Sequence, residues 1–547
     1  MAKINIFALG GLDEKAKNMY VLEIDSKMYI IDAGINEPVR DDFGVQQIIP
    51  KLDYLKLNSD KIKGIFLSTP AKYQLGAIWH VVKLFPNIPI HTSDVTSELI
   101  KLQFGEKFHA KLNMNIMKSG EEAVVSNIPV KAYTISAAVP GTFAFVFKTK
   151  DGNIVYATDY ISDETPQLET DHNLFLDDMS KEKNLVFMSD SFNSKLDGFV
   201  SPKHSIKDYI INQLDSDARV VASIYEDELV NVYELIQLSA EYNKKIYIFD
   251  KKIFEMLNFI MDKGYFAKLP LELYKPGIEK KNSIVVITGT RTDLYQTLKR
   301  IIQEDDIDTF NITKEDTIFL ASPPQPGNEH IYAGIGNDLS VFNPDVISVH
   351  IKDKNTFHPA KGDLDRFIKK INPKHFMPIK GWYMFLAEGA KVSKENGIHE
   401  KQTIIGDNGD MFTFENGNYQ GLTRKIREVG DQYIELSSDD KIDTQVIEER
   451  VNLAKDGIVT IGLIINPQTK RAISNVDIQL KGVVFIRGQE KLLKTLSDQI
   501  LDILRQEREG TFQIPKVIAR IKKEITKELR ATIKKAPDLI IKIEELK

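Results

Sequence analysis

The sequence contains no cysteine, and this absence excludes several kinds of chemistry at once. None of the 547 residues is Cys, so disulfides, cysteine-bound zinc and thiol catalysis are ruled out. No run of eighteen apolar residues occurs, and the first residues, MAKINIFALGG, lack the layout of a signal peptide. We therefore expect a cytoplasmic protein that does not enter a membrane.

An excess of basic residues is also missing. The formal net charge is −6, so non-specific binding of polyanions by the whole surface is not expected, and neither is binding to DNA. Contact with RNA would need a local basic patch. What is present is ordinary: 42% hydrophobic and 27% charged residues are typical of a globular protein, and the length predicts two to four domains.

The stretch Ile65–Ala77 has the layout of a catalytic loop without its usual residues. Residues 65–67 predict the end of a buried strand, and a helical pattern continues from Gly76. Loops between a strand and a helix commonly hold a metal or a phosphate. Residues 69–74 read Thr-Pro-Ala-Lys-Tyr-Gln, and none of them is a good ligand for zinc or for a hard cation.

Acidic residues follow three of the predicted strands. Asp32, Asp159 and Asp190 each stand at or just past the end of an apolar run. Because three strands each end near an aspartate, we predict that the three side chains lie along the rim of one site. For Asp32 taken alone, a turn or capping role is an equal alternative.

The pattern of predicted secondary structure changes in the middle of the chain. Residues 204–350 alternate between near-continuous apolar strands and helices, which predicts a parallel sheet covered on both faces. The turn Thr288–Arg291 follows one such strand. It could bind a phosphate, but an ordinary turn between a strand and a helix is the simpler interpretation.

The last part of the chain predicts a separate module. Residues 424–448 are charged, with few apolar pairs, and are interpreted as a linker. Strands at Ile458–Ile465 and Val483–Arg487 and two amphipathic helices follow. The basic face of the second helix fits a solvated surface or, alternatively, a surface for RNA or a partner.

The succession of motifs resembles the ribonuclease J family of metallo-β-lactamase/β-CASP nucleases. The matching segments span nearly the whole chain and include IIDAG, IVYATDYISD, MSDS, PGNE and NPKHFMPIKG. The resemblance implies an α/β fold: a metallo-β-lactamase αββα sandwich interrupted by a β-CASP α/β domain, with a small α/β C-terminal domain for assembly. The implied boundaries are 1–203 and 351–423 for the sandwich, 204–350 for the β-CASP domain, 424–450 for a linker and 451–547 for the C-terminal domain.

The resemblance also implies a metal site of two zinc or manganese ions, whose ligands are mostly missing here. The family's metal-binding residues correspond to Thr69, Ala71, Tyr73, Gln74, Ala137 and Lys380. The matching positions that survive are Asp32, Asp159, Asp190 and His358. A dinuclear centre needs both ions held by several ligands, so we expect no metal cofactor. Lys72 and Lys380 would place positive charge where a cation should sit.

Three functions follow from this pattern. The first is a non-catalytic or very weakly active subunit that binds an active ribonuclease J paralogue, in a homo- or hetero-dimer or tetramer, and modulates RNA processing. The second is a residual metal-dependent 5′–3′ exo- or endoribonuclease. The third is an RNA-binding protein that does not cut. By resemblance, a 5′-phosphate pocket would involve Lys354, Thr356 and His358, although the family's Ser and Gly are replaced at Thr356 and Phe357.

Overall fold

The computed structural model describes residues 3–546 apart from eight segments and four single residues inside that range. Those omitted are 39–43, 164–169, 278–280, 291–292, 304–309, 326, 351, 355, 436–439, 443, 484–488 and 508–511. The chain forms two compact units, Met1–Arg40 with Gln47–Gln432, and Asp41–Gln46 with Tyr433–Lys547. No helix among the described residues is both long and apolar enough to cross a membrane.

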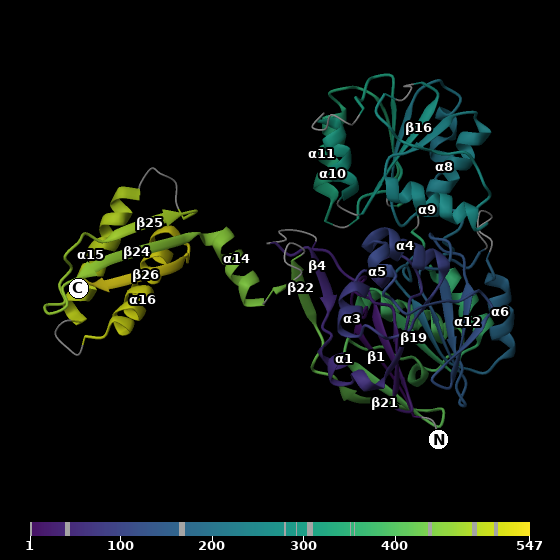
Figure 1. Cartoon of the computed structure of the whole chain (residues 1–547), viewed down its shortest axis with the longest axis horizontal. Helices are drawn as coiled ribbons and strands as arrows, with labels where there is room; N and C mark the ends of the chain where they lie inside the picture. The colour runs from purple at the N-terminus through teal and green to yellow at the C-terminus, as the bar shows by residue number, and fades with distance from the viewer. Residues whose placement is uncertain are drawn as a thin grey trace. The chain divides into compact units, whose positions relative to one another are not determined.

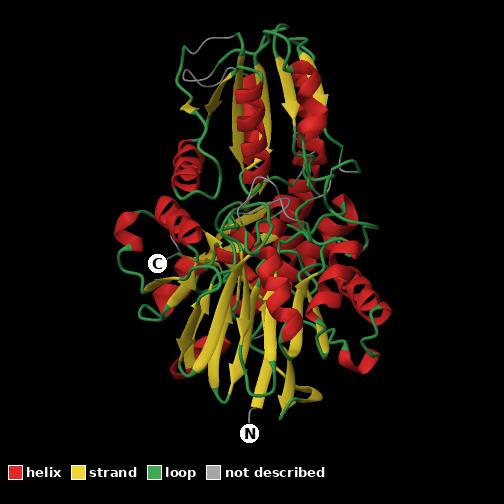
Figure 2. Cartoon of the chain, turned by 90° about the vertical axis from the view of Figure 1, so that its right-hand side faces the viewer, coloured by secondary structure: helices red, strands yellow, loops and turns green. Residues whose placement is uncertain are grey.

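Two sheets form the core of the first unit (Figure 2). One has the strand order β21-β20-β1-β2-β3-β5-β6-β7, and the other has the order β19-β12-β11-β10-β9-β8. The bounds in the first sheet are β1 Lys3–Gly10, β2 Met19–Ile24, β3 Lys27–Ile31, β5 Ile62–Phe66, β6 Ile90–Thr92, β7 Met114–Ile116, β20 Asp410–Glu415 and β21 Asn418–Lys425. Those in the second are β8 Glu122–Val125, β9 Ile128–Thr134, β10 Phe143–Phe147, β11 Asn153–Ala157, β12 Asn184–Asp190 and β19 His375–Ile379.

Helices cover the outer faces of both sheets. One apolar cluster joins residues of the two sheets, from Ile4 and Leu22 on one side to Phe145 on the other. A second cluster packs helices α6 (His172–Lys181), α12 (Lys361–Ile371) and α13 (Tyr383–Glu395) on the second sheet. On the first sheet, Phe7 of β1 contacts Tyr54 of α1 (Asp53–Leu57). The predicted αββα sandwich is confirmed.

The region between β12 and β19 holds a separate sheet with the order β15-β14-β16-β13-β17-β18, in which every strand pair is parallel. Helices α8 and α9 lie on one face and α10 and α11 on the other, over separate apolar clusters (Figure 1). The prediction of a parallel sheet covered on both faces is confirmed. The strands are β13 Val220–Tyr225, β14 Lys245–Ile248, β15 Glu272–Leu273, β16 Ser283–Gly289, β17 Thr317–Leu320 and β18 Asp345–Ser348; the helices are α8 Leu229–Glu241, α9 Lys251–Asp262, α10 Asp293–Ile302 and α11 Glu329–Leu339.

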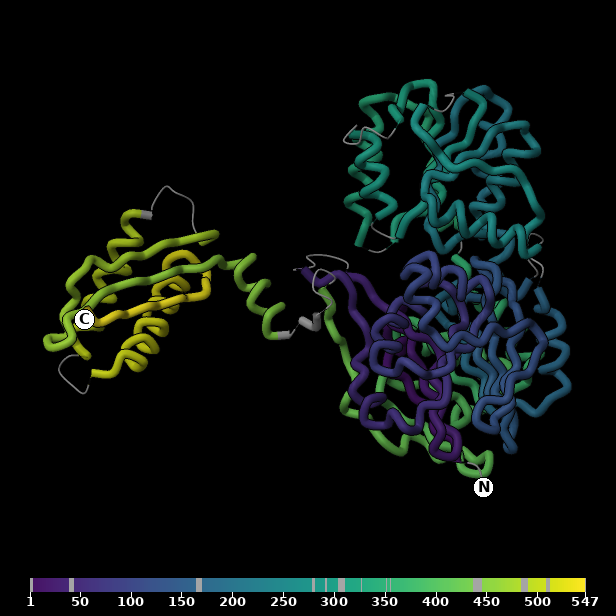
Figure 3. Tube along the Cα trace, in the orientation of Figure 1, coloured from purple at the N-terminus to yellow at the C-terminus, as the bar shows by residue number. Residues whose placement is uncertain are grey.

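The chain then returns to the sandwich. β19 pairs with β12, and β20 pairs with β1, so the segment after the inserted sheet completes both sheets of the core (Figure 3). The helical pattern predicted from Gly76 onward corresponds to α3 (Ile78–Leu84), which Gly76 and Ala77 separate from a second short helix, α2 (Lys72–Leu75). Helix α4 (Asp94–Phe104) begins with Ser93 as its N-cap.

The second unit contains a three-stranded sheet with the order β25-β24-β26. Helices α15 (Gln489–Glu507) and α16 (Ile514–Ile533) are the two predicted amphipathic helices, and their apolar faces pack on this sheet. The strand predicted at Val483–Arg487 falls largely outside the described residues, and the strands present are β24 Ile458–Ile465, β25 Asp477–Lys481 and β26 Asp538–Glu545. The segment predicted as a linker contains β22 (Asp431–Glu435), β23 (Asp440–Ile442) and the start of α14 (Thr444–Asp456).

Candidate functional site

Two of the predicted acidic residues meet at one edge of the second sheet. Asp190 is the last residue of β12, and Asp159 follows the neighbouring parallel strand β11. Carboxyl ends of parallel neighbours lie at the same edge, and the backbone N–H of Asp159 donates to Oδ2 of Asp190 over 3.0 Å. The predicted rim is therefore present for this pair.

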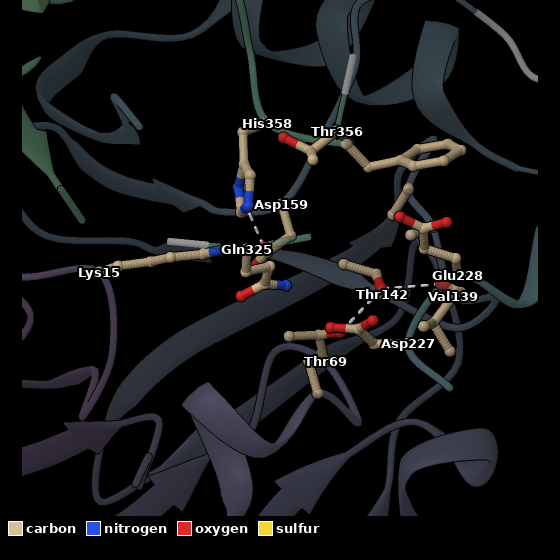
Figure 4. Close-up of a pocket in the computed structure, with 14 residues that line it drawn as sticks. Lys15, Thr69, Val139, Thr142, Asp159, Asp227, Glu228, Gln325, Thr356 and His358 are labelled. Atoms are coloured by element: carbon tan, nitrogen blue, oxygen red, sulfur yellow. Dashed lines mark hydrogen bonds and ion pairs between the residues drawn. The ribbon is translucent and has the colours of Figure 1, made fainter. Parts of the chain in front are cut away.

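His358 and Lys380 complete a compact charged cluster around these aspartates. Nδ1 of His358 lies 2.8 Å from Oδ2 of Asp190 and 3.2 Å from Oδ1 of Asp159, the second of which is drawn in Figure 4. The Lys380 ammonium forms an ion pair with Oδ1 of Asp159 and lies 4.0 Å from Oδ2 of Asp190. The Lys380 side chain is 1% exposed, so its charge is balanced almost entirely by these carboxylates.

Charge governs the protonation of Asp190. Complete burial would by itself raise the pKa of its carboxyl group. Its neighbours His358 and Lys380 outweigh that effect, together with a hydrogen bond from the backbone N–H of Phe192, and the pKa of Asp190 lies below its usual value. Asp190 is thus held as a carboxylate.

Asp159, Asp190 and His358 also have the chemistry of metal ligands. Within the described part of the chain, they are the only three His, Asp or Glu residues whose ligand atoms all lie within 4.8 Å of one another. Two carboxylates and an imidazole suit a divalent transition metal. The Lys380 ammonium, however, is already bonded to Asp159 in this same space.

The loop 68–74 reaches the cluster through one residue. The Gln74 side-chain amide donates to Oδ2 of Asp159, and Gln74 is fully buried. The Lys72 ammonium instead binds Glu37 over 2.6 Å, so the expectation that Lys72 would lie among the aspartates is wrong. Residues 72 and 74 are two apart in α2, and side chains two apart do not share a helix face.

A close backbone approach fixes this loop against the end of β3. The carbonyl oxygen of Tyr73 accepts hydrogen bonds from the backbone N–H of Asn18, over 3.0 Å, and from its side-chain amide, over 3.1 Å. A Cβ atom at Gly34 would lie 1.7 Å from that same oxygen. Glycine is therefore required at position 34 by space rather than by backbone angle.

Asp32 lies in the sandwich interior with a different set of partners. Its carboxylate accepts hydrogen bonds from the backbone N–H of Ser68 (2.8 Å), the Ser68 hydroxyl (2.9 Å) and the hydroxyl of Tyr156 on β11 (2.5 Å). Complete burial raises its pKa to about 7, although these hydrogen bonds act in the opposite direction. Sequence reasoning missed Tyr156, because nothing in the sequence pairs the end of β11 with the end of β3.

Three site residues share an uncommon backbone conformation. Asp32, Asp159 and Lys380 have φ angles of 61°, 52° and 55°. Left-handed conformations at residues other than glycine cost free energy and gather at functional sites. For lysine, which lacks the local hydrogen bonds that help Asp and Asn, the conformation is the more notable.

A cavity of about 60 Å³ opens beside the cluster (Figure 4). Thr69, Ala71 and Ala137, at three of the positions matched to family metal ligands, line it together with Asp159 and His358. The structure thus brings separate segments of the sequence to one place. The Thr142 hydroxyl donates to that of Thr69 over 3.2 Å.

Residues that follow β13 also line the cavity. Asp227 and Glu228 line it, and Lys15 and Gln325 also contribute. Sequence reasoning did not single out these residues. The sequence does carry a signal for them: Glu226, Asp227 and Glu228 follow directly after an apolar strand, as the other aspartates do.

Thr356 and Lys354, two of the residues predicted for a 5′-phosphate pocket, lie in different environments. Thr356 lines the cavity, and its hydroxyl and carbonyl oxygens both accept from the Asn193 side-chain amide over 3.1 Å. Lys354 is 3% exposed, and its ammonium forms an ion pair with Glu228.

Known proteins resemble this chain along its whole length. Residues 217–339 match the family described as ribonuclease J, beta-CASP domain, and residues 445–546 match the ribonuclease J C-terminal domain. Ribonuclease J 2 from Staphylococcus aureus is 24% identical, with 99% of this chain and 98% of that protein aligned. The chain belongs to the ribonuclease J family. MG423, an uncharacterized protein from Mycoplasma genitalium, is 26% identical over 98% of this chain and 96% of its own length.

A solved structure supports the fold alone. A protein of unknown function from Enterococcus faecalis aligns with 75% of this ribonuclease J family chain and with all of its own length. The TM-score is 0.50 and the sequence identity is 12%.

Proposed function

We propose that this ribonuclease J family member is a non-catalytic or very weakly active subunit that associates with an active paralogue and modulates its RNA processing. One observation carries the proposal: the buried Lys380 ammonium is bonded to Asp159 and lies 4.0 Å from Asp190. A fixed side-chain cation thus stands between the acidic residues that would otherwise attract a metal ion.

The residues present do not fit a dinuclear centre. Both carboxylate oxygens of Asp159 already have partners, Lys380 on one and Gln74 on the other. Thr69, Ala71 and Ala137 around the adjacent cavity supply no imidazole or carboxylate. Two-metal hydrolysis needs each ion held by several protein ligands, so we derive no hydrolytic step here.

Lys380 also explains how the fold tolerates the remaining aspartates. Buried carboxylates without a counter-charge destabilise a protein strongly, whereas a buried ion pair with hydrogen bonds can be sustained. Lys380 supplies positive charge, and the His358 imidazole and backbone N–H groups supply hydrogen bonds. The cluster therefore needs no ion for its electrostatic balance.

A second candidate function is a residual nuclease that uses a single ion. The proximity of ligand atoms from Asp159, Asp190 and His358 favours it. For this activity, Lys380 would have to leave Asp159 when the ion binds. An RNA degradation assay on protein made without any active paralogue tests it, with Asp159→Ala as the control against a contaminating nuclease.

Metal content separates the two candidates. Elemental analysis of the purified full-length chain, after dialysis against manganese or zinc, should find well below one ion per chain. Two tightly bound ions would overturn the non-catalytic proposal, and one ion together with RNA cleavage that Asp159→Ala abolishes would favour the residual nuclease.

The partner role is tested by mass. The chain is mixed with an active ribonuclease J paralogue, and the molar mass is measured by light scattering during size-exclusion chromatography. A mixed species of defined stoichiometry, with changed cleavage rate or products, is expected. If the two proteins elute separately and the paralogue's cleavage is unaffected, the subunit role is refuted. A gel-shift titration against salt then tests RNA binding without cleavage.

A further inference from the structure

The loop that carries His358 is anchored to the β-CASP sheet through Lys354. The Lys354 ammonium forms an ion pair with Glu228 and donates to the carbonyl oxygen of Ala321 over 3.3 Å. Glu228 stands between β13 and α8, and Ala321 follows β17. The carboxylate of Glu228 also accepts from Asn231 and Ser322, each over 3.2 Å. One lysine thus binds the carboxyl edge of the β-CASP sheet at two strand ends.

The same loop is anchored to the sandwich on its other side. The Asn193 side-chain amide donates to the carbonyl oxygens of Thr356 and His358, over 3.1 and 3.0 Å. The imidazole of His358 then contacts Asp190 at the end of β12. Within five residues, the loop therefore passes from a contact with one domain to contacts with the other.

We propose that the Lys354–Glu228 ion pair is a latch that couples the orientation of the β-CASP domain to the position of His358 beside the aspartates. The Lys354 side chain is 1% exposed and that of Glu228 is 10% exposed. Separating two buried charges without rehydrating them is costly, so the pair opens only when water enters the space between the domains. Rotation of the β-CASP domain then acts on His358 through Lys354. This inference holds whether or not the chain cuts RNA.

Further opposite charges face each other at the same crevice. Burial raises the pKa of Glu226 to about 7, and the nearby Lys72 acts against that rise. Burial likewise raises the pKa of Asp227, and Lys15 and Lys72 oppose it. Carboxylates from the β-CASP domain are thus near lysines from the sandwich, and the Lys354–Glu228 pair is the most deeply buried part of this arrangement.

The test uses Lys354→Met, which removes the charge but keeps an unbranched side chain, and Glu228→Gln, which keeps most of the shape. Hydrogen exchange of the full chain is followed in peptides that cover 352–360 and 226–232. Both segments should exchange at least about tenfold faster in either variant, equivalent to about 1.4 kcal/mol of lost local stability. If Lys354→Met does not fold, the milder Glu228→Gln carries the test.

A matched control comes from a second buried ion pair inside the β-CASP domain. Arg219 and Asp316 are each 3% exposed, with 2.8 Å between their charged atoms, and both belong to that one domain. Asp316→Asn should destabilise the β-CASP domain without accelerating exchange in 352–360. Equal acceleration in this control and in Lys354→Met would show a merely structural role and overturn the latch.

Domain orientation supplies an independent measurement. Because the chain has no cysteine, Lys56→Cys on α1 and Gln296→Cys on α10 create the only two thiols for spin labels, and both positions are exposed. The distance distribution between the labels should broaden or shift when Lys354→Met is added. An unchanged distribution would refute the coupling between the pair and the domain orientation.

Discussion

Replacing Asp32 by Asn should make the sandwich more stable at alkaline pH. Asp32 is fully buried, and burial raises its pKa to about 7 from an ordinary value of 3.8. Asn keeps the acceptor for the Ser68 backbone N–H and can donate to the hydroxyl oxygens of Ser68 and Tyr156. It resembles the protonated acid, and it never ionises.

The sign and size of the effect follow from linkage. Below about pH 4, Asp32 is protonated in the folded and the unfolded chain, so its ionisation costs nothing. Between about pH 4 and pH 7 the unfolded chain loses this proton while the folded chain retains it, and the stability falls by about 1.36 kcal/mol per pH unit. The full loss, reached above pH 7, is about 4 kcal/mol. Between pH 5 and pH 8 the variant should gain about 3 kcal/mol relative to the parent protein.

The assay exploits the position of the two tryptophans. Trp79 lies in α3 and Trp382 precedes α13, so urea unfolding followed by tryptophan fluorescence reports on the sandwich. The informative quantity is the stability difference between Asp32→Asn and the parent protein at each pH, because other acidic groups contribute equally to both. A difference that stays flat from pH 5 to pH 8, or that falls, would refute the reasoning.

Three further substitutions test the contacts of the site. Lys380→Met leaves the buried carboxylate of Asp190 and the partly buried one of Asp159 without the Lys380 cation and should lower the free energy of unfolding by about 3 kcal/mol; manganese should restore part of this loss in the variant while leaving the parent protein unchanged. Gly34→Ala forces a methyl group onto the Tyr73 carbonyl and should lower the free energy of unfolding by about 3 kcal/mol, whereas Gly334→Ala, at a helical position with open space, should not, as urea titration would reveal. Gln74→Leu removes one donor to the partly buried carboxylate of Asp159 and should lower the same quantity by about 1 kcal/mol; an unchanged urea midpoint would contradict the hydrogen bond.

Local sequence patterns were sufficient where one strand decides the outcome. The ends of β11 and β12 place Asp159 and Asp190 together because the two strands are parallel neighbours, and apolar runs followed by an acidic residue were visible in the sequence. The stripes of α15 and α16 were equally readable, since the helical period alone determines which residues face the sheet.

Local sequence patterns could not predict contacts between side chains of different sheets. The Tyr156 hydroxyl reaches Asp32 across the sandwich, and the partner of Lys72 depends on which way a four-residue helix turns. The charged composition of residues 424–448 predicts a linker, but the structure has strand β22 there. The polar residue Gln432 is buried in β22 alongside Ile434, which conceals the alternation of apolar and polar residues in the sequence.

The pairing of β1 with β20 has a consequence for the order in which the chain folds during synthesis. β1 begins at residue 3 and its partner at residue 410, so one side of β1 keeps unpaired N–H and C=O groups until most of the chain has left the ribosome. The strands of the inserted β-CASP sheet lie between residues 220 and 348, a much shorter stretch of chain. Contacts between distant segments form slowly, so this insertion should fold first and act as a tether that limits how far β20 must search for β1. Truncation before residue 410 should therefore yield a folded β-CASP domain attached to an open and aggregation-prone sheet.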